Sequence, residues 1–318
     1  MTRTNCKFQI LFFIASLFLS SCATILNGPA QRVFISTDRN IKAVSLDKDD
    51  KVDSTFIGIN SPGIYYVARS DKPLKISLQT GSIRRSVFLK AKKSFAYWSN
   101  IYCNYGVGLL VDKNTVKKFA YKKRNYFTYK DTSVSVSRFA PIQKGTINLS
   151  LSLPIPFGNI FDIKKAGGQY HSIGVLGFAA GLDYFYRDNH YLSLDAGVAT
   201  DVFAEHIGRG YYETGGVIFA SVQNNNVVGS FDFGYGLNLS QFKWTNRLNG
   251  DTIKIAQSLK NTGLGLSLSA QYRLGNYLRI GVLYQPCIIN TSLNPVFDYQ
   301  HYISINLTWK IPVIKAAD

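Results

Sequence analysis

The stretch that decides the fold is Phe231-Asp232-Phe233-Gly234-Tyr235-Gly236-Leu237-Asn238-Leu239. Apolar side chains occupy every second position, and Asp, Gly and Asn stand between them. Successive side chains of a β-strand point to opposite faces, so this alternation predicts a strand with one apolar and one polar face. The same pattern recurs in residues 147–153, 264–272 and 303–311, all in the second half of the chain.

Eight strands of this kind are predicted, at residues 146–155, 172–186, 191–203, 213–223, 227–242, 261–274, 277–288 and 301–311. The fourth is the least regular, because Val217-Ile218-Phe219-Ala220 does not alternate. Short and long connections follow each other in turn. Tight turns are expected at 187–190, 224–226 and 275–276, and long loops at 157–171, 204–212, 243–260 and 289–300. This pattern predicts an all-β, antiparallel, up-and-down barrel.

Residues 144–312 thus resemble the small eight-stranded outer-membrane barrels of the OmpA and OmpX type. The resemblance implies a transmembrane barrel with short periplasmic turns and longer outside loops. Aromatic residues near the expected strand ends are interpreted as two girdles. One lies near the short turns (Tyr184, Tyr186, Tyr191, Tyr272, Tyr277, Trp309) and one near the long loops (Phe203, Phe242, Trp244, Tyr299, Tyr302). The alternative is a lipid-anchored, lipocalin-like carrier of an apolar ligand, whose faces would be reversed.

Six charged residues stand on the polar face of the predicted strands: Asp183, Asp195, Asp232, Arg273, Arg279 and Lys310. Charges that are removed from water need partners. We therefore expect an internal ion-pair network inside a small, plugged barrel. A path for protons or ions along the lumen is the alternative.

Residues 1–21 have the features of a secretory signal peptide, with Arg3 and Lys7 ahead of a short apolar run. The following Leu19-Ser20-Ser21-Cys22 resembles the lipobox of bacterial lipoproteins. That resemblance implies cleavage before Cys22, a diacylglyceryl group on its thiol and acylation of the new amine. No cofactor besides this covalent lipid and no metal is expected. Ala23 replaces the aspartate that commonly retains lipoproteins in the inner membrane, so we expect the inner leaflet of the outer membrane. The alternative is an ordinary signal in which Cys22 is incidental.

The net charge of +17 is unevenly spread, with +13 on residues 23–143 and +2 on residues 144–318. This step predicts a boundary near Lys144 between a basic domain at 22–143 and the barrel at 144–312, with a tail at 313–318. Short alternating runs predict a small β-sandwich in the basic domain. An even number of strands returns both barrel ends to the side of the short turns, so the basic domain is expected in the periplasm.

The basic domain carries a second resemblance, to the PEGA-like lipoproteins of bacterial envelopes, over residues 22–121. It rests on Cys22-Ala23-Thr24-Ile25-Leu26-Asn27-Gly28, Trp98-Ser99-Asn100-Ile101, Gly106-Val107-Gly108 and Leu110-Val111-Asp112-Lys113-Asn114-Thr115. The Pro-Glu-Gly-Ala motif itself is missing. The resemblance implies an envelope adaptor or wall-associated module and no catalytic residues.

The densest basic and aromatic stretch is residues 117–130. Its candidate contacts to an anionic surface are Lys117, Lys118, Lys122, Lys123 and Arg124. The alternative is a solvated strand and linker. Nucleic acid would fit the composition, but the envelope compartment argues against it. Residues 101–111 are too short to span a bilayer and are expected to form a hairpin or helix.

These features predict a non-enzymatic outer-membrane lipoprotein whose plugged barrel anchors a module that binds anionic lipid or the cell wall. Its expected partners are outer-membrane lipids and the cell wall or another envelope protein. One alternative is a surface recognition or adhesion protein that acts through the long loops, above all 243–260. Another is a lipid-modifying barrel enzyme, for which His206, beside Glu205 and near Asp201, is the only candidate.

Overall fold

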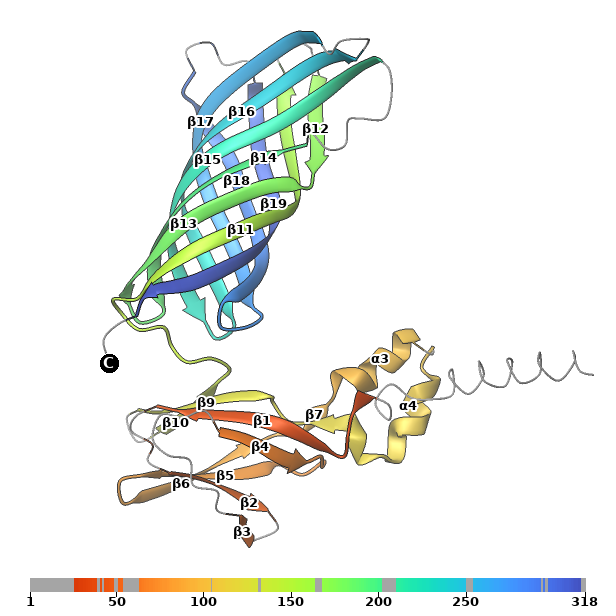
Figure 1. Cartoon of the computed structure of the whole chain (residues 1–318), viewed down its shortest axis with the longest axis vertical. Helices are drawn as coiled ribbons and strands as arrows, with labels where there is room; N and C mark the ends of the chain where they lie inside the picture. Colours follow the sequence, from red (N-terminus) through yellow and green to blue (C-terminus); the bar gives the residue numbers. More distant parts are fainter. Residues whose placement is uncertain are drawn as a thin grey trace, which may run out of the picture. The chain divides into compact units, whose positions relative to one another are not determined.

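The computed structural model describes residues 26–38, 41, 43–48, 51–53, 63–103, 105–130, 133–163, 168–201, 210–249, 254–292, 294 and 297–315. The predicted signal peptide and Cys22 lie outside these residues. The chain forms two compact units, residues 1–140 and 141–318, so the division falls three residues before the expected boundary. Both units are built mainly of β-strands (Figure 1).

The first unit contains two four-stranded sheets, in the orders β10-β9-β1-β4 and β3-β2-β5-β6. The strands are β1 (Ala30–Thr37), β2 (Ala43–Lys48), β3 (Lys51–Asp53), β4 (Gly63–Ala68), β5 (Leu74–Thr80), β6 (Ile83–Leu89), β9 (Arg124–Lys130) and β10 (Ser133–Ser137). Neighbours are antiparallel except β1 and β9, which run parallel. The parallel pair joins the beginning of the domain to its end.

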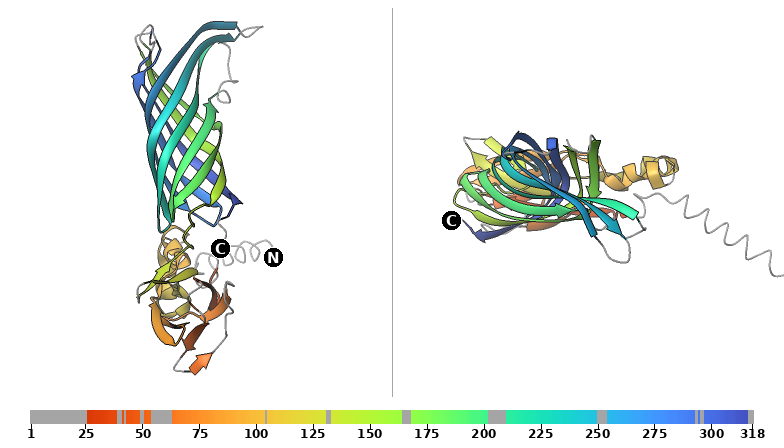
Figure 2. Two further views of the ribbon diagram at one scale, coloured as in Figure 1. Left: turned by 90° about the vertical axis from the view of Figure 1, so that its left-hand side faces the viewer. Right: turned by 90° about the horizontal axis from the view of Figure 1, so that it is seen from above.

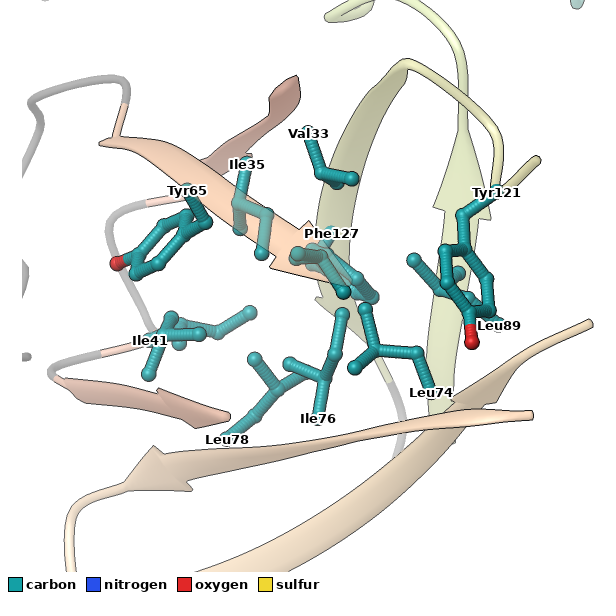
Figure 3. Close-up of a cluster of buried hydrophobic side chains, with 12 residues drawn as sticks. Val33, Ile35, Ile41, Tyr65, Leu74, Ile76, Leu78, Leu89, Tyr121 and Phe127 are labelled. Atoms are coloured by element: carbon teal, nitrogen blue, oxygen red, sulfur yellow. The ribbon is translucent and has the colours of Figure 1, made fainter. Parts of the chain in front are cut away.

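The core of this unit lies between the two sheets (Figure 3). Val33 and Ile35 of β1 meet Ile76 and Leu78 of β5, and Phe127 of β9 completes the layer. Alternate residues of β1 and β4 point inward, which is the pattern of a strand with one buried face. This arrangement is the small β-sandwich that the sequence predicts.

A helical hairpin is inserted between two short strands of the same unit, β7 (Lys92–Lys93) and β8 (Phe119–Ala120). It consists of α3 (Phe95–Cys103), α4 (Val107–Val111) and the 3-10 turns Asp112–Asn114 and Val116–Lys118. Most of residues 101–111 are thus helical. None of the helices in the described part of the chain is long and apolar enough to cross a membrane.

The second unit is an eight-stranded antiparallel up-and-down barrel, as predicted (Figures 1 and 2). Its strands in the described residues are β11 (Ile147–Ile163), β13 (Leu176–Arg187), β14 (His190–Thr200), β15 (Gly210–Val228), β16 (Phe231–Asn249), β17 (Lys254–Arg273), β18 (Leu278–Asn290) and β19 (Phe297–Ile314). Each strand pairs with the next along the chain, and β19 pairs with β11 to close the barrel. The last strand therefore extends into the predicted tail.

The predicted second strand, 172–186, is divided at Val175 into β12 (Gly168–Gly174) and β13. The first part of β11, Ile147–Ser152, pairs with β13. Its last part, Phe157–Ile163, pairs with β12. Pro154 and Pro156 lie between these two parts. Proline has no backbone N–H, so the ladder is interrupted where the two prolines stand.

Three expectations about the connections are wrong. The expected long loop 157–171 is mostly strand, because β11 continues to Ile163 and β12 pairs with it from Gly168. The turn between β15 and β16 is Gly229-Ser230 and not 224–226, because Gly229 adopts the left-handed backbone (φ 63°) that this turn requires. The expected long loop 243–260 is mostly strand, since β16 and β17 continue to pair as far as Leu248 and Lys254. Apolar periodicity marks only the part of a strand that has one apolar face, so the predicted strands were shorter than β16 and β17 are.

Candidate functional site

The outer surface of the barrel is apolar on every strand from β13 to β19. Exposed side chains on these seven strands include Leu182, Leu194, Val222, Leu237, Leu266, Val282 and Ile305. The interior is polar, because every one of the eight strands has buried polar side chains. One from each strand is Ser150, Asp183, Ser193, Gln223, Asn238, Ser267, Gln285 and Asn306. An exposed apolar band of this extent is a surface for lipid. A lipocalin-like carrier would have the opposite arrangement.

Only part of the expected aromatic girdles faces outward. Near the short turns Tyr184, Tyr186 and Tyr277 are exposed, whereas Tyr191 is buried in the lumen. Near the long loops Tyr299 is exposed, and Phe203 lies outside the described residues. Phe242, Trp244 and Tyr302 are at most 2% exposed and point inward, so their assignment to a girdle is wrong. On β16 the even-numbered residues point inward, and Phe242 and Trp244 follow this rule although they are apolar.

Two ion pairs lie inside the barrel near the short turns. The Lys310 Nζ is 2.9 Å from the Asp183 Oδ2, and the Arg279 Nε is 2.5 Å from the Asp232 Oδ2. All four side chains are buried. The Lys310 ammonium also donates to the Tyr191 hydroxyl and lies 4.1 Å from the centre of that ring. Each pair connects strands that are not neighbours in the sheet, so both pairs cross the lumen.

The two remaining charged candidates lie in the same region. Arg273 is buried and is paired in register with Arg279 across β17 and β18. Asp195 accepts a hydrogen bond from the Ser150 hydroxyl and lies opposite Gly181, where a larger side chain would contact its Oδ1. A cavity of about 40 Å³ lined by Ser150, Asp195, Gln223 and Lys310 is left between these groups. It has room for about three water molecules.

An aromatic cluster fills the lumen on the side of the long connections. Phe157, Phe219, Phe242, Trp244 and Tyr302 are all buried there. The ring of Tyr302 lies 5.9 Å from that of Phe157 and 5.5 Å from that of Phe219. Val217 and Phe219 point inward, which explains why the fourth predicted strand did not alternate. The barrel is thus filled by charges at one level and by aromatic rings at another.

The structure divides the five candidate cations of the basic segment into two groups. Lys117 and Lys118 belong to the second 3-10 turn, where the Lys118 ammonium donates to the Lys113 carbonyl. Lys122, Lys123 and Arg124 are exposed at the turn into β9. Partial burial and the positive charges of Arg138 and Lys92 lower the pKa of Lys122. The positive charges that act on Lys122 thus come from two other segments of the sandwich.

Two aromatic residues of the basic segment do not join this surface. Tyr121 and Phe127 are buried in the core of the sandwich. The Tyr121 hydroxyl donates to the Lys72 carbonyl, and Phe127 is fully buried between the sheets. A surface that stacks ligands on these two rings is therefore excluded, although the exposed cations keep their access to solvent.

The described residues give no support to a lipid-modifying enzyme. His206 and Glu205 lie outside them, and Asp201 accepts hydrogen bonds from the Tyr170 hydroxyl and the Gly215 backbone N–H. Within the described part of the chain, no three His, Cys, Asp or Glu side chains could hold a metal ion. Cys287 is a free thiol.

Comparison with solved structures finds barrels with a similar chain trace. The attachment invasion locus protein Ail of Yersinia pestis, solved with the heparin analogue sucrose octasulfate, has 12% identity and a TM-score of 0.34 over 54% of this chain and 99% of Ail. Neisserial surface protein A has 13% identity and a TM-score of 0.33 over 52% of this chain and 96% of its own. Outer membrane protein AlkL has 17% identity and a TM-score of 0.31 over 57% of this chain and 97% of its own.

No protein-family model and no curated protein matches the sequence. The PEGA-like resemblance of residues 22–121 therefore stays a prediction. The description of the second unit as a lipid-facing barrel depends on its strand pairing and on the apolar band over its surface.

Proposed function

We propose that this protein is a non-enzymatic outer-membrane lipoprotein, in which a plugged barrel anchors a basic periplasmic sandwich that binds an anionic envelope component. The observation that carries the proposal is the cross-section of the barrel. Its outside is an apolar band, and its inside is filled by two ion pairs and an aromatic cluster. Such a barrel suits an anchor better than a channel or a carrier.

The entry of the chain into the barrel supports a periplasmic sandwich. Residues 142–145 are held at the short-turn end, where the Ile142 N–H donates to the Asn189 side chain and the Gly145 N–H to the Phe185 carbonyl. Strand β19 ends at the same level, because Ile314 pairs with Ile147. Short turns face the periplasm in bacterial barrels of this class, which is also where a lipid on Cys22 would hold the sandwich.

Fractionation with a heat-modifiability gel tests the anchor. Native protein and a Cys22→Ala variant are both expected in the membrane pellet, with a faster band before boiling that shifts after it. Mass spectrometry of the native protein should show the acyl chains on Cys22. Release of Cys22→Ala into the soluble fraction would contradict the proposed barrel anchor, and an unmodified Cys22 would contradict the lipoprotein assignment.

Charge reversal tests the basic surface. Full-length protein in zwitterionic nanodiscs is expected to bind peptidoglycan sacculi or phosphatidylglycerol vesicles, and replacement of Lys117, Lys118, Lys122, Lys123 and Arg124 by Glu should remove that binding. A matched control reverses five cations elsewhere on the sandwich: Lys72, Lys75, Arg84, Arg85 and Lys90. Equal loss in both variants would indicate net charge alone, and no loss in the first would exclude this site.

The length of β16 favours surface recognition as a second function. A 19-residue strand tilted by about 40° rises about 48 Å, compared with about 25 Å for the apolar band of such barrels. The β16–β17 hairpin therefore projects beyond the bilayer. An epitope inserted between residues 250 and 253 should be labelled on intact cells. An epitope that is labelled only after lysis would exclude recognition at the surface through this hairpin.

A further inference from the structure

The helical hairpin, whose helices α3 and α4 are labelled in Figure 1, carries several large apolar side chains that are exposed to solvent. Phe95, Tyr102 and Tyr105 are 87%, 88% and 91% exposed, and Leu110 is 75% exposed. Trp98 is half-exposed on the same helix as Phe95 and Tyr102. We refer to these five side chains as the hairpin face. Large apolar residues are rarely gathered on a surface that only water contacts.

The hairpin face is held in a fixed shape. Residues 95, 98 and 102 lie on one side of α3, since they are spaced by three and four positions, while Ala96, Tyr97 and Asn100 are buried on the other side. The Asn100 Nδ2 donates to the buried Asp112 Oδ2 at 2.9 Å, which ties α3 to the turn after α4. Tyr105 has a left-handed backbone (φ 50°), an unusual conformation for a side chain of this size.

Asn27, which follows Cys22 by five positions in the sequence, is fixed to the base of this hairpin. The Asn27 Nδ2 donates to the Ser94 hydroxyl and to the Lys117 carbonyl, both at 2.9 Å. Ser94 is the residue immediately before α3 and accepts the Tyr97 N–H. Five peptide units separate Cys22 from Asn27 and span at most about 18 Å. A lipid on Cys22 must therefore enter the bilayer close to the hairpin.

The surroundings of the hairpin face are positively charged. Lys92, Lys93 and Lys113 are exposed beside it, and the Lys93 ammonium lies 5.3 Å from the centre of the Trp98 ring. Between residues 72 and 130 the sequence has 14 Lys and Arg residues and one acidic residue, Asp112, which is buried. Apolar rings within a rim of lysines complement a bilayer, whose acyl chains lie beneath anionic phosphates.

We infer that the hairpin face lies in the surface of the bilayer that holds the Cys22 lipid. Its aromatic rings reach the level of the headgroups and upper acyl chains, and Lys92, Lys93 and Lys113 contact phosphate groups. Through Lys92 this contact adjoins the basic turn at 122–124. The inference rests on the proposed acylation of Cys22.

Tryptophan quenching by brominated lipid tests this contact in the full-length, acylated protein. Trp98 is made the sole tryptophan by Trp244→Phe and Trp309→Phe, and the protein is reconstituted into phosphatidylcholine–phosphatidylglycerol vesicles. We expect phosphatidylcholine brominated in the upper acyl chain to quench Trp98 at least twofold. A Tyr102→Ser, Leu110→Ser variant should lose most of that quenching. A Tyr66→Ser, Phe88→Ser variant, which removes exposed apolar residues elsewhere on the sandwich, should retain it.

The outcomes separate this inference from the proposed function. Acylated, heat-modifiable protein without quenching would overturn the inference and leave the proposed function intact. Blue-shifted Trp98 emission without quenching by lipid would also overturn the inference, because it would indicate that protein and not lipid contacts the hairpin face. Equal quenching in the Tyr102→Ser, Leu110→Ser variant would show that the hairpin face does not carry the contact. Absence of the acyl chains would overturn both proposals together.

Discussion

The Lys310 ammonium lies 2.9 Å from the Asp183 carboxylate and 2.6 Å from the Tyr191 hydroxyl, so one cation joins β19 to β13 and β14 across the barrel interior. Lys310→Met is expected to destabilise the barrel by about 3–5 kcal/mol, because it leaves a buried carboxylate without its cation. The urea midpoint of the heat-modifiable band measures this loss.

Two further variants show whether charge pairing is the cause. A Lys310→Met, Asp183→Leu double variant should recover most of the stability, since replacement of a whole buried pair is often neutral. Lys315→Met removes an exposed cation immediately after the same strand and should change the midpoint little. A double variant as unstable as Lys310→Met would show that lost charge pairing is not the cause.

The two filled levels of the lumen predict that the barrel does not conduct ions. Native protein in planar bilayers should give no unitary currents. Tyr302→Ala opens the aromatic cluster but leaves the Arg279–Asp232 and Lys310–Asp183 pairs in place, so it should be silent too. Stable currents from either protein would show that the cavity beside Asp195 continues through the barrel.

Close approach of strands in the barrel wall predicts an asymmetry between two glycines. A Cβ on Gly236 would meet the Val222 carbonyl and lie 2.7 Å from the Gln223 Cα, whereas a Cβ on Gly275 would have no neighbour within 4 Å. Gly236→Ala should cost about 1–3 kcal/mol through overpacking. Gly275→Ala should be nearly neutral. Equal urea midpoints for the two variants would mean that the wall can yield at Gly236.

The Asn100–Asp112 hydrogen bond predicts a local effect in the helical hairpin. Asp112→Ala leaves the buried Asn100 amide without this acceptor, at a cost of about 1–3 kcal/mol. Amide exchange of residues 95–111 should therefore accelerate by about 5- to 150-fold, while that of β5 stays unchanged. Asp71→Ala removes an exposed carboxylate and is the control. Unchanged exchange at 95–111 would show that other contacts hold the hairpin.

The sequence was most informative about the barrel wall, because lipid outside and polar groups inside produce a two-residue period in every strand. It was least informative where the lumen becomes aromatic. Phe242 and Trp244 are apolar on the polar face, so the pattern ended there although the strand continues to Asn249. The six charged candidates were found because a charged side chain on the polar face of a barrel strand points into the lumen, where it needs a partner.

In the sandwich, the residue pattern separated the strands but did not show which aromatics were buried. Phe127 and Tyr121 stand among lysines and arginines in the sequence, and both belong to the core. Conversely, Tyr102 and Leu110 belong to the apolar stretch 101–111 and are exposed. Their positions depend on contacts between distant segments, such as the hydrogen bonds of Asn27, which local periodicity does not encode.

The closure of β11 on β19 places a constraint on biogenesis. The first strand of the barrel meets its final partner only when the last strand has been made, so until then one edge of β11 presents unpaired backbone groups. An open edge invites pairing with other chains. Pro154 and Pro156 lie in the middle of that edge and cannot donate to an incoming strand. These prolines are therefore expected to weaken unwanted pairing of β11 until the C-terminal strand is in place.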